Sequence, residues 1–567
     1  MTNEQPPASN LQPRRSSAFR WALLGVLGVA VTGSTFALAQ RGDGYSFFEP
    51  IVDVQSLVEN YYVEDVDAEE LQRGAIEGML EVLDDPYTDY VPPVLADDFN
   101  KDLLGEYVGI GASVNTAPGR LQIVSPLEDS PAFHAGVMAG DIVLEIDGQS
   151  TEGLSVDECI DLLKGVPGTS VTIRVDRDGE ELDIDIERGE IKTLSVKGYH
   201  RLDDEDGKWE HMIDRERKIG YIRLVQFTPQ CSVEVREALG RLRADRGELG
   251  GLVFDLRGNL GGGLDEAIRI VDFFMDEGVI VSTRGRAFPE DITRAGRRGT
   301  LPDFPMAVLL DGASASASEI VSGALQENDR AIVVGTRSFG KGSVQTLRPL
   351  GRDGLAQFKF TTQRYYLPSG RSIQRTDGSA TWGVDPSPGF YVPMTSEERI
   401  RAFTVRQEQD VIRSAGARDE SQDEWANVTW VLERLEDKQL TAAVTAVQQR
   451  IDTGEWIPTG DTPPEGEDLA AEQLVEVQAQ RRELLKAIVD LDRRIGRLSV
   501  AAAGGETEPE VDLWDNELEI EGGRVTVIGP DGDTIAELDV TGPDLERWLS
   551  FADLEKPSAG DGEAPSE

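Results

Sequence analysis

The sequence is poor in the residues that mark disulfide-rich or zinc-binding proteins. Its 567 residues include two cysteines and three histidines. Cys159 and Cys231 each lie among apolar neighbours, which predicts buried free thiols rather than a disulfide framework or a catalytic cysteine. His134, His200 and His211 show no metal-ligand spacing. We therefore expect no metal site.

Positive charge is also scarce. The chain has 56 Lys and Arg against 104 Asp and Glu, a formal net charge of −48, and its isoelectric point is near 4.4. Phosphate binding needs a positively charged surface, so nucleic acid is excluded as a partner. The negative charge itself indicates solubility or an acidic environment, and it says nothing about a substrate.

The N-terminus carries a long apolar run. Residues 21–39 follow Arg14, Arg15 and Arg20 and end in an A-L-A sequence before a glutamine. A basic start, an apolar stretch and an A-x-A site are typical of an export signal, although the run is nearly long enough to stay as an anchoring helix. We predict that residues 1–39 are a signal peptide, slightly favoured, or an N-terminal membrane anchor. The rest of the chain then lies in the periplasm or cell envelope.

Hydrophobic periodicity divides the rest of the chain into five regions. Residues 45–104 have apolar residues at helical spacing, and residues 105–190 contain short strands typical of a small β module. Residues 191–392 alternate strands and helices, which predicts an α/β core with a largely parallel sheet. Residues 395–504 are predicted to be helical, with one long amphipathic helix that suits a homo-oligomer or packing on its own core. Residues 505–567 form an acidic extension with short strands and a disordered tail.

Two motifs around Lys341 are misleading. The segment GTRSFGKG, residues 335–342, nearly matches a phosphate-binding loop, but Gly342 stands where a hydroxyl must hold magnesium, and a strand pattern follows. We therefore expect no nucleotide and no cofactor. Ser338 and Lys341 also match the S-x-x-K motif of penicillin-binding enzymes. That motif needs a helix, which the flanking glycines disfavour, and its S-D-N companion is missing.

The segment LLDGASASASEIVSGALQEN, residues 309–328, offers a candidate nucleophile. Ser316 and Glu319 fit an S-x-x-E capping box at the start of a helix, so the serine is either a helix cap or a nucleophile. No histidine is suitably placed to activate it. A lysine serves when burial lowers its pKa, and Lys341 lies in a glycine-rich loop after a buried strand. Ser–Lys pairs are a known variant of the catalytic triad.

Donors for an oxyanion are found at the end of another predicted strand. The segment DLRGNLGGG, residues 255–263, offers glycine N–H groups where crevices form in open α/β sheets. The strand before Ser316 is expected to end at the same edge, where the N–H of Ala317 begins a helix. The alternative is that these glycines only make a tight turn.

Three stretches together resemble one family. GASASASEIVSGALQENDRAIVVGTRSFGKGSVQ, VFDLRGNLGGGLDEAI and LQRGAIEGMLEVLDDPYTDY are similar to the C-terminal processing peptidases, or tail-specific proteases. The resemblance covers about residues 45–392. It implies an α/β protease core with a ClpP/crotonase-like sheet, an inserted PDZ domain, an N-terminal helical segment and a C-terminal helical and β extension. One departure is N-L-G-G at residues 259–262, where the family usually has Asn-Pro-Gly-Gly.

The resemblance assigns roles to five residues. It implies that Ser316 is the nucleophile, Lys341 its general base and Gln345 the residue that orients the lysine. It also implies that the N–H groups of Ala317 and Gly262 bind the oxyanion.

The resemblance extends to a PDZ domain through the segment YVGIGASV. Its Gly109, Ile110, Gly111 and Ala112 match the loop whose N–H groups bind a terminal carboxylate, while the peptide adds as a strand at the sheet edge. The predicted helix SVDECIDLLKG forms the other wall. The expected partners are proteins with free, apolar C-termini. In this family the PDZ domain also gates the protease, which implies a lysine out of place until peptide binds.

Two functions remain open from the sequence. The leading hypothesis is an exported serine endopeptidase that cleaves proteins near their C-termini. The alternative is a catalytically inactive scaffold that binds protein tails, but the presence of Ser316, Lys341 and Gln345 together disfavours it.

Overall fold

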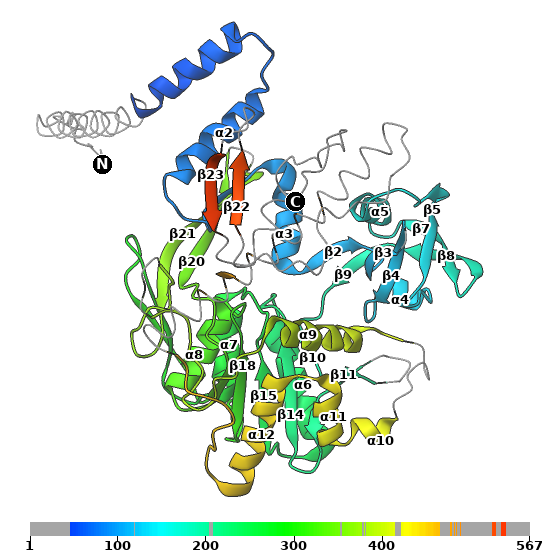
Figure 1. The fold of residues 1–567 in the computed structure, drawn as a ribbon, viewed down its shortest axis with the longest axis vertical. Helices are drawn as coiled ribbons and strands as arrows, with labels where there is room; N and C mark the ends of the chain where they lie inside the picture. The colour runs from blue at the N-terminus through cyan, green and yellow to red at the C-terminus, as the bar shows by residue number, and fades with distance from the viewer. Residues whose placement is uncertain are drawn as a thin grey trace, which may run out of the picture. The chain divides into compact units, whose positions relative to one another are not determined.

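The computed structural model describes residues 46–117, 119–202, 208–351, 354–376, 379, 381–413 and 421–464, seven positions between 474 and 491, and residues 524–528 and 534–539. The chain divides into two compact units, Met1–Pro463 and Pro464–Glu567. Figure 1 shows the fold.

The first unit begins with helices. Residues 46–61 are helical, followed by α2 (Ala68–Glu81), strand β1 (Asp89–Val91) and α3 (Pro93–Leu104). Asp67 caps α2 by accepting a hydrogen bond from the Glu69 N–H at 2.8 Å. The predicted helices of this region are therefore present, and β1 is an addition, which pairs with a later strand, β21 (Ala356–Tyr366).

The next part is a small β module with its own core. A sheet in the order β3-β4-β5-β7-β8, with β6 paired to β5, packs against α4 and α5, and β2 pairs with β9. The elements are β2 (Glu106–Gly109), β3 (Ala112–Ala117), β4 (Arg120–Pro126), α4 (Pro131–His134), β5 (Ile142–Ile146), β6 (Gln149–Ser150), α5 (Val156–Leu163), β7 (Ser170–Arg177), β8 (Glu180–Glu187) and β9 (Gly189–Lys192). Cys159 is buried in this core, as predicted.

The central sheet of the first unit has the order β10-β14-β15-β18-β19, with β13 paired to β14. Its strands are β10 (Val196–Lys197), β13 (Met212–Asp214), β14 (Ile219–Leu224), β15 (Gly251–Asp255), β18 (Met306–Leu310) and β19 (Ile332–Gly335). The last four are parallel, which confirms the α/β prediction. All their residues are buried, as expected of a sheet covered on both faces.

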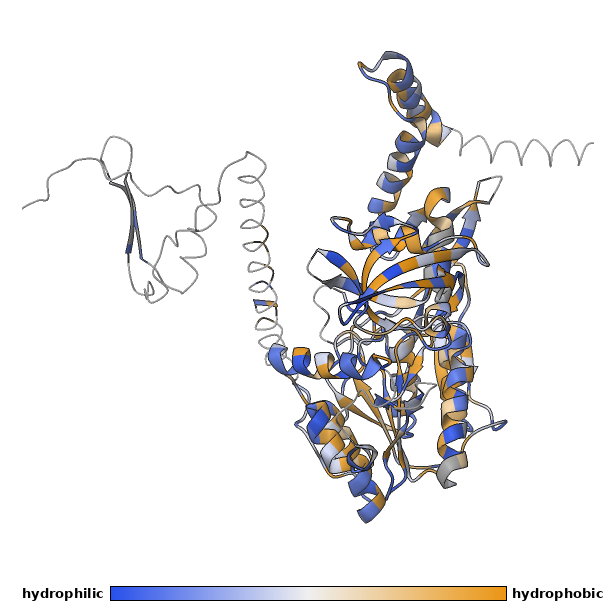
Figure 2. Cartoon of the chain, turned by 90° about the vertical axis from the view of Figure 1, so that its right-hand side faces the viewer, coloured by the Kyte–Doolittle hydropathy of each residue, from blue (hydrophilic) through white to orange (hydrophobic). Residues whose placement is uncertain are grey.

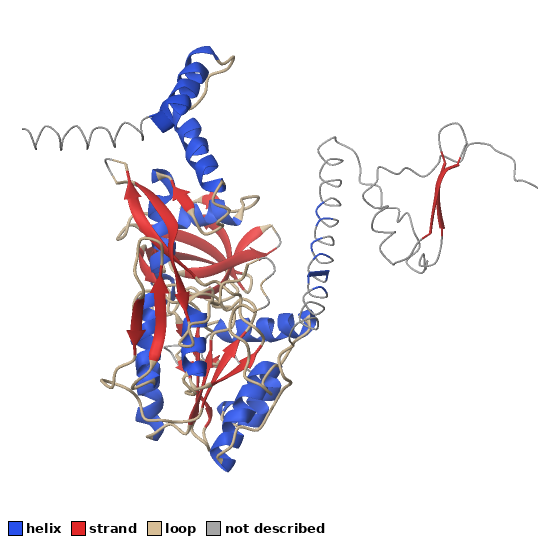
Figure 3. Cartoon of the chain, turned by 90° about the vertical axis from the view of Figure 1, so that its left-hand side faces the viewer, coloured by secondary structure: helices blue, strands red, loops and turns tan. Residues whose placement is uncertain are grey.

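Alternate residues of these strands belong to two separate cores. Leu252 and Phe254 pack with α6 (Cys231–Arg246), α7 (Leu264–Phe274) and α8 (Ala317–Glu327) on one face. Val253 points to the other face, where the core includes residues of α9 (Ser396–Asp410), α11 (Val428–Leu435) and α12 (Lys438–Thr453). The short helix α10 (Gln422–Trp425) lies between α9 and α11 in sequence. Helices α9, α11 and α12 thus form the second layer of this core. Figure 3 shows helices on both sides of these strands.

An antiparallel sheet lies beside this core. It has the order β1-β21-β16-β17, and β20 pairs with β21. The strands not yet given are β16 (Val279–Arg284), β17 (Asp291–Arg294) and β20 (Ser343–Leu350), and a further short pair is β11 (His200–Arg201) with β12 (Trp209–Glu210). Strand β20 confirms the predicted strand after Lys341. Figure 2 shows hydrophobic residues concentrated along strands and mixed with hydrophilic ones on surface helices.

In the second unit, β22 (Arg524–Ile528) and β23 (Thr534–Asp539) form an antiparallel pair, which confirms short strands in the acidic extension. The described positions between 474 and 491 are helical, as the amphipathic pattern predicts. The predicted helical region 395–504 is therefore divided between the two units. The tail predicted to be disordered and the apolar N-terminal segment lie outside the described residues. Among the residues that are described, no helix combines the length and apolar character needed to cross a membrane.

Candidate active site

Ser316 lies in a strained turn between β18 and α8. The turn, residues 311–316, is here called the serine turn. Ser316 has φ +55° and ψ −113°, a conformation that non-glycine residues adopt only when their surroundings enforce it. Its carbonyl accepts hydrogen bonds from the N–H groups of Glu319 (2.9 Å) and Ile320 (3.0 Å). Its side chain is partly exposed. The turn therefore presents one hydroxyl at the start of a buried helix.

The neighbouring serines, Ser314 and Ser318, are fully buried and have structural roles. The Ser314 hydroxyl accepts from the Asp311 N–H at 3.0 Å and donates to the Leu256 carbonyl at 2.9 Å. The Ser318 hydroxyl donates to the Asn259 carbonyl at 2.9 Å. Ser314 therefore attaches the serine turn, and Ser318 the start of α8, to the segment that follows β15.

That segment contains a glycine strap, residues 258–263, which lies directly against the serine. A Cβ on Gly261 would stand 2.7 Å from Ser316 Cβ and 3.0 Å from the Ala317 nitrogen, and a Cβ on Gly262 would stand 2.3 Å from the Phe227 carbonyl oxygen. Both glycines also have positive φ, +101° and +144°. Only glycine fits such a close approach. Within the described residues, the N–H groups of Gly262 and Ala317 donate no hydrogen bond, so both are available to an oxyanion.

Asn259 fixes the strap, a role that the motif alone did not reveal. Its side chain donates to the Leu224 carbonyl at 2.7 Å and accepts from the Gly261 N–H at 2.9 Å. Its carbonyl accepts from the Ala315 N–H at 3.0 Å. Leu260, which stands where the family usually has proline, is 72% exposed. The side chain that departs from the family pattern, Leu260, therefore faces solvent.

Glu319 joins the serine turn to the lysine loop, residues 336–342. Its carboxylate is fully buried. It accepts hydrogen bonds from the N–H groups of Ser316 (2.7 Å), Gly340 (2.7 Å) and Lys341 (2.9 Å) and from the Ser338 hydroxyl (2.6 Å). The bond to Ser316 was predicted as half of a capping box. The three bonds to the lysine loop were not, because nothing local in the sequence relates the two segments.

A tyrosine also bridges these two segments. The Tyr365 hydroxyl lies between the carbonyl oxygens of Ser316, at 3.1 Å, and Lys341. Ser338 lies in the non-helical loop and accepts a hydrogen bond from the Val384 N–H at 2.7 Å. The helical S-x-x-K arrangement of penicillin-binding enzymes is therefore absent at Ser338 and Lys341.

The Lys341 ammonium lies 4.5 Å from the centre of the Tyr87 ring. Burial lowers the pKa of Lys341, as the sequence predicted, and the charge of Lys359 lowers it further, while Glu319 and Asp85 act in the opposite direction. Asp85 and Tyr87 belong to the DDPYTDY segment before β1. Sequence reasoning noted that segment only as part of a family likeness and missed its contact with the lysine.

Gln345 is not bonded to the lysine in this structure. Its amide nitrogen donates to the hydroxyl groups of Ser343 (2.9 Å) and Thr361 (3.1 Å). In the described part of the chain, no hydrogen bond joins the Ser316 hydroxyl to Lys341 Nζ. The orienting role of Gln345 and the direct Ser316–Lys341 contact therefore stay predictions.

The predicted carboxylate-binding loop connects β2, which ends at Gly109, to β3, which begins at Ala112. Ile110 and Gly111 are buried. The Ser130 hydroxyl donates to the Gly111 carbonyl at 2.7 Å, and Gly111 has φ +76°. A Cβ there would stand 2.4 Å from Ser130 Cβ, so this position requires glycine. The binding role of the loop stays a prediction.

The pKa of Glu319 makes stability depend on pH. Burial raises this pKa from 4.5 to about 7, against the opposing effect of its four hydrogen bonds. Between these values the folded protein holds a proton that the unfolded chain releases, so the free energy of unfolding should fall as pH rises. Glu319→Gln cannot titrate and should lack this component. Urea unfolding of both proteins from about pH 4 to about pH 8 measures the difference, and parallel curves would contradict the prediction.

Three family models match the sequence. "Peptidase family S41" matches residues 218–387, "Activating protease CtpB N-terminal domain" residues 35–92 and "PDZ domain" residues 122–177. The first covers the serine turn, the glycine strap and the lysine loop. The third lies within the small β module.

Named relatives agree with these models. A carboxy-terminal-processing protease of Bartonella bacilliformis is 38% identical over 391 residues, 67% of this chain and 84% of the relative. A probable CtpA-like serine protease of Staphylococcus saprophyticus is 31% identical over 354 residues, 62% of this chain and 67% of the relative. Among solved structures, a photosystem II D1 C-terminal processing protease is 26% identical. The match covers 59% of this chain and 86% of that protein, with a TM-score of 0.35. The chain therefore belongs to the carboxy-terminal-processing proteases of peptidase family S41, serine-type peptidases, and carries a PDZ domain.

Proposed function

We propose that the chain is an exported endopeptidase in which Ser316 is the nucleophile and Lys341 the general base. One observation carries the proposal. The partly exposed Ser316 has the glycine strap packed against its Cβ, and the same Glu319 carboxylate accepts from the N–H groups of both Ser316 and Lys341. A nucleophile, oxyanion donors and a base thus share one small region.

In the proposed reaction, the Ser316 hydroxyl oxygen attacks the scissile carbonyl carbon while neutral Lys341 takes its proton. The oxyanion is bound by the N–H groups of Ala317 and Gly262. The lysine then gives the proton to the leaving amine, which leaves an acyl ester on Ser316. Water, deprotonated by the same lysine, then attacks the ester carbonyl. The lysine returns the proton to the departing Ser316 oxygen, which restores the enzyme and releases a product with a new carboxylate end.

The lysine must move for this reaction. Its ammonium contacts the Tyr87 ring, and such contacts favour the charged form, whereas a base must be neutral. We propose that substrate binding draws the side chain from Tyr87 to Ser316, and that Gln345 then orients it. Burial and the nearby Lys359 already lower its pKa in the observed position, which favours the neutral form.

We further propose that the PDZ domain binds the free C-terminus of a protein substrate. The loop Gly109, Ile110, Gly111 and Ala112 would hold the terminal carboxylate through backbone N–H groups. Apolar residues of α5 would receive the last side chains. The localisation proposed from residues 1–39 is the periplasm or cell envelope, with the apolar segment as signal or anchor.

Substitution of the proposed catalytic residues tests the mechanism. Ser316→Ala and Lys341→Ala should each lower kcat/KM by about a thousandfold or more, because nucleophile and base act as a unit. Loss of the serine cap should cost only about 1 kcal/mol. Ser322→Ala is a matched control, because Ser322 lies on the same helix and bonds only within it. The assay uses a loosely folded protein with an apolar C-terminus and maps fragments by mass spectrometry.

Cleavage by Ser316→Ala at the wild-type rate would refute the mechanism. No cleavage by any form of the protein, with binding of the substrate tail retained, would instead favour the tail-binding scaffold.

Substrate recognition is tested at the terminal carboxylate. A substrate that ends in an amide should be cleaved about 10- to 100-fold less efficiently than the free acid, because hydrogen bonds to the charged group are lost. Gly111→Ala should weaken binding of the free acid, since its Cβ would collide with Ser130. Calorimetry and kcat/KM measure both effects. Equal binding and cleavage of acid and amide would contradict carboxylate recognition.

A further inference from the structure

The C-terminal helices reach the glycine strap through a buried ion cluster. Arg257 stands between β15 and the strap. Its guanidinium donates to Asp255 from Nε (3.0 Å) and Nη2 (2.7 Å), to Asp437 from Nη1 and Nη2 (both 2.8 Å), and to Gln439 Oε1 from Nη1 (3.2 Å). These bonds use all five N–H donors of the side chain. Arg257 is therefore held in one orientation.

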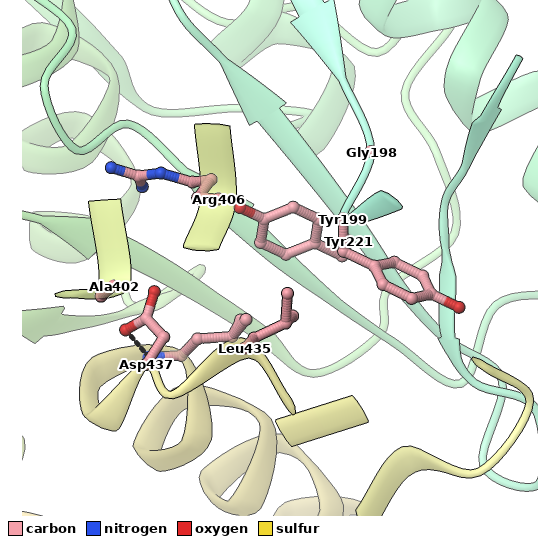
Figure 4. A pocket seen from close by; sticks show the side chains of 8 residues that line it. Gly198, Tyr199, Tyr221, Ala402, Arg406, Leu435 and Asp437 are labelled. Atoms are coloured by element: carbon pink, nitrogen blue, oxygen red, sulfur yellow. Dashed lines mark hydrogen bonds between the residues drawn. The ribbon is translucent and has the colours of Figure 1, made fainter. Parts of the chain in front are cut away.

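The residues that hold Arg257 are themselves fixed in the second helical layer. Asp437 is the N-cap of α12 and accepts from the Leu440 N–H at 3.0 Å. Gln439 donates to the Val392 carbonyl at 2.9 Å. Figure 4 shows the small pocket beside the cluster, with Tyr221, Arg406 and Asp437 among the side chains that line it. The position of Arg257 thus depends on where α12 begins.

The cluster is balanced in charge. Asp255 also accepts from the Tyr221 hydroxyl at 2.7 Å and lies 3.8 Å from Arg406. Burial favours the neutral carboxyls, but Arg257 and Arg406 hold the pKa values of both Asp255 and Asp437 below their usual range. Two carboxylates therefore face two guanidinium groups. Removal of one carboxylate would leave a buried positive charge without its partner.

A short path leads from Arg257 to the active serine. The next residue, Gly258, donates its N–H to Asp311 in the serine turn at 3.0 Å. The residue after that, Asn259, accepts from the Ala315 N–H. The side chain of Arg257 therefore anchors the first end of the strap, whose Gly262 N–H is a proposed oxyanion donor.

We propose that Asp437 is a positioning residue for catalysis, which acts through Arg257 to hold the glycine strap against Ser316. The inference rests on the proposed function, because it assumes that the strap binds the oxyanion. It also gives the C-terminal helical layer a part in the chemistry, although no residue of that layer touches the reacting atoms.

The test is Asp437→Asn in the full chain. Asparagine keeps one acceptor oxygen for the Leu440 N–H and for Arg257 Nη1, but it removes the charge, and its NH2 group cannot accept the bond from Arg257 Nη2. Loss of one oxyanion donor costs about 100- to 1,000-fold, and a misplaced donor less. We expect kcat to fall about 10- to 100-fold with KM within about twofold. The affinity for a peptide boronic acid, which forms a tetrahedral adduct with the serine, should fall similarly, while the affinity for the product peptide stays unchanged.

Asp452→Asn is the matched control. Asp452 lies on the same helix and pairs with Arg217 at 2.9 Å, but it is half exposed and remote from the strap. It should leave kcat and the boronic acid affinity unchanged. Folded Asp437→Asn with wild-type kcat and boronic acid affinity would overturn the proposal.

A second variant tests the positioning role of Asp437 if the first variant has a folding defect. If Asp437→Asn does not fold, Asp437→Glu decides, because it keeps the charge and displaces Arg257 by one methylene. Wild-type kcat in folded Asp437→Glu would overturn the proposal, and a fall in kcat with unchanged KM would support it. Ser316→Ala distinguishes a failure of the proposed function from a failure of this inference. If that variant still cleaves, the proposed function fails, whereas an essential Ser316 with wild-type kcat in the Asp437 variants removes only this inference.

Discussion

The buried carboxylate of Glu319 is the constraint on which the active site depends. A carboxylate removed from water must be compensated by hydrogen bonds. Its four donors come from two distant segments, the serine turn and the lysine loop. Neither segment can move away without leaving part of the carboxylate unbonded. The hydrogen bonds that compensate the buried Glu319 carboxylate therefore also hold Ser316 close to the backbone of Lys341.

The backbone of the site and the side chain of Lys341 are held in place by different kinds of contact. The serine turn is over-determined, since Glu319, Tyr365 and Asn259 all bond to it, and this explains how Ser316 keeps a strained φ. Lys341 has a fixed backbone, but its ammonium rests on the Tyr87 ring. Under the proposed mechanism, the site is rigid where the oxyanion would be bound, whereas the side chain of the proposed base, Lys341, has to change position. Such an arrangement suits a protease that must not cleave until a substrate tail is bound.

Local patterns were sufficient to predict the parts of the site but not their connections. Ser316, the strap and the flanking strands each have a signature within about ten residues, and the structure places them together. The contacts of Tyr87 with Lys341 and of Asp437 with Arg257 join residues far apart in sequence, and a single sequence carries no signal of such pairs. Periodicity predicted helices after residue 395, but it cannot tell which sheet a helix will cover. The orienting role that the likeness implies for Gln345 stays a prediction, because its amide bonds to Ser343 and Thr361 in this structure.

The most direct test of the account is the site of covalent labelling by a serine-reactive fluorophosphonate. The full chain would be treated in the presence of a peptide with a free apolar C-terminus, and the adduct would be located by peptide mass spectrometry. The account predicts a single adduct on Ser316, because that hydroxyl alone in the turn is partly exposed and lies beside the proposed oxyanion donors. An adduct on Ser314, Ser318 or Ser338, or no adduct at all, would contradict it.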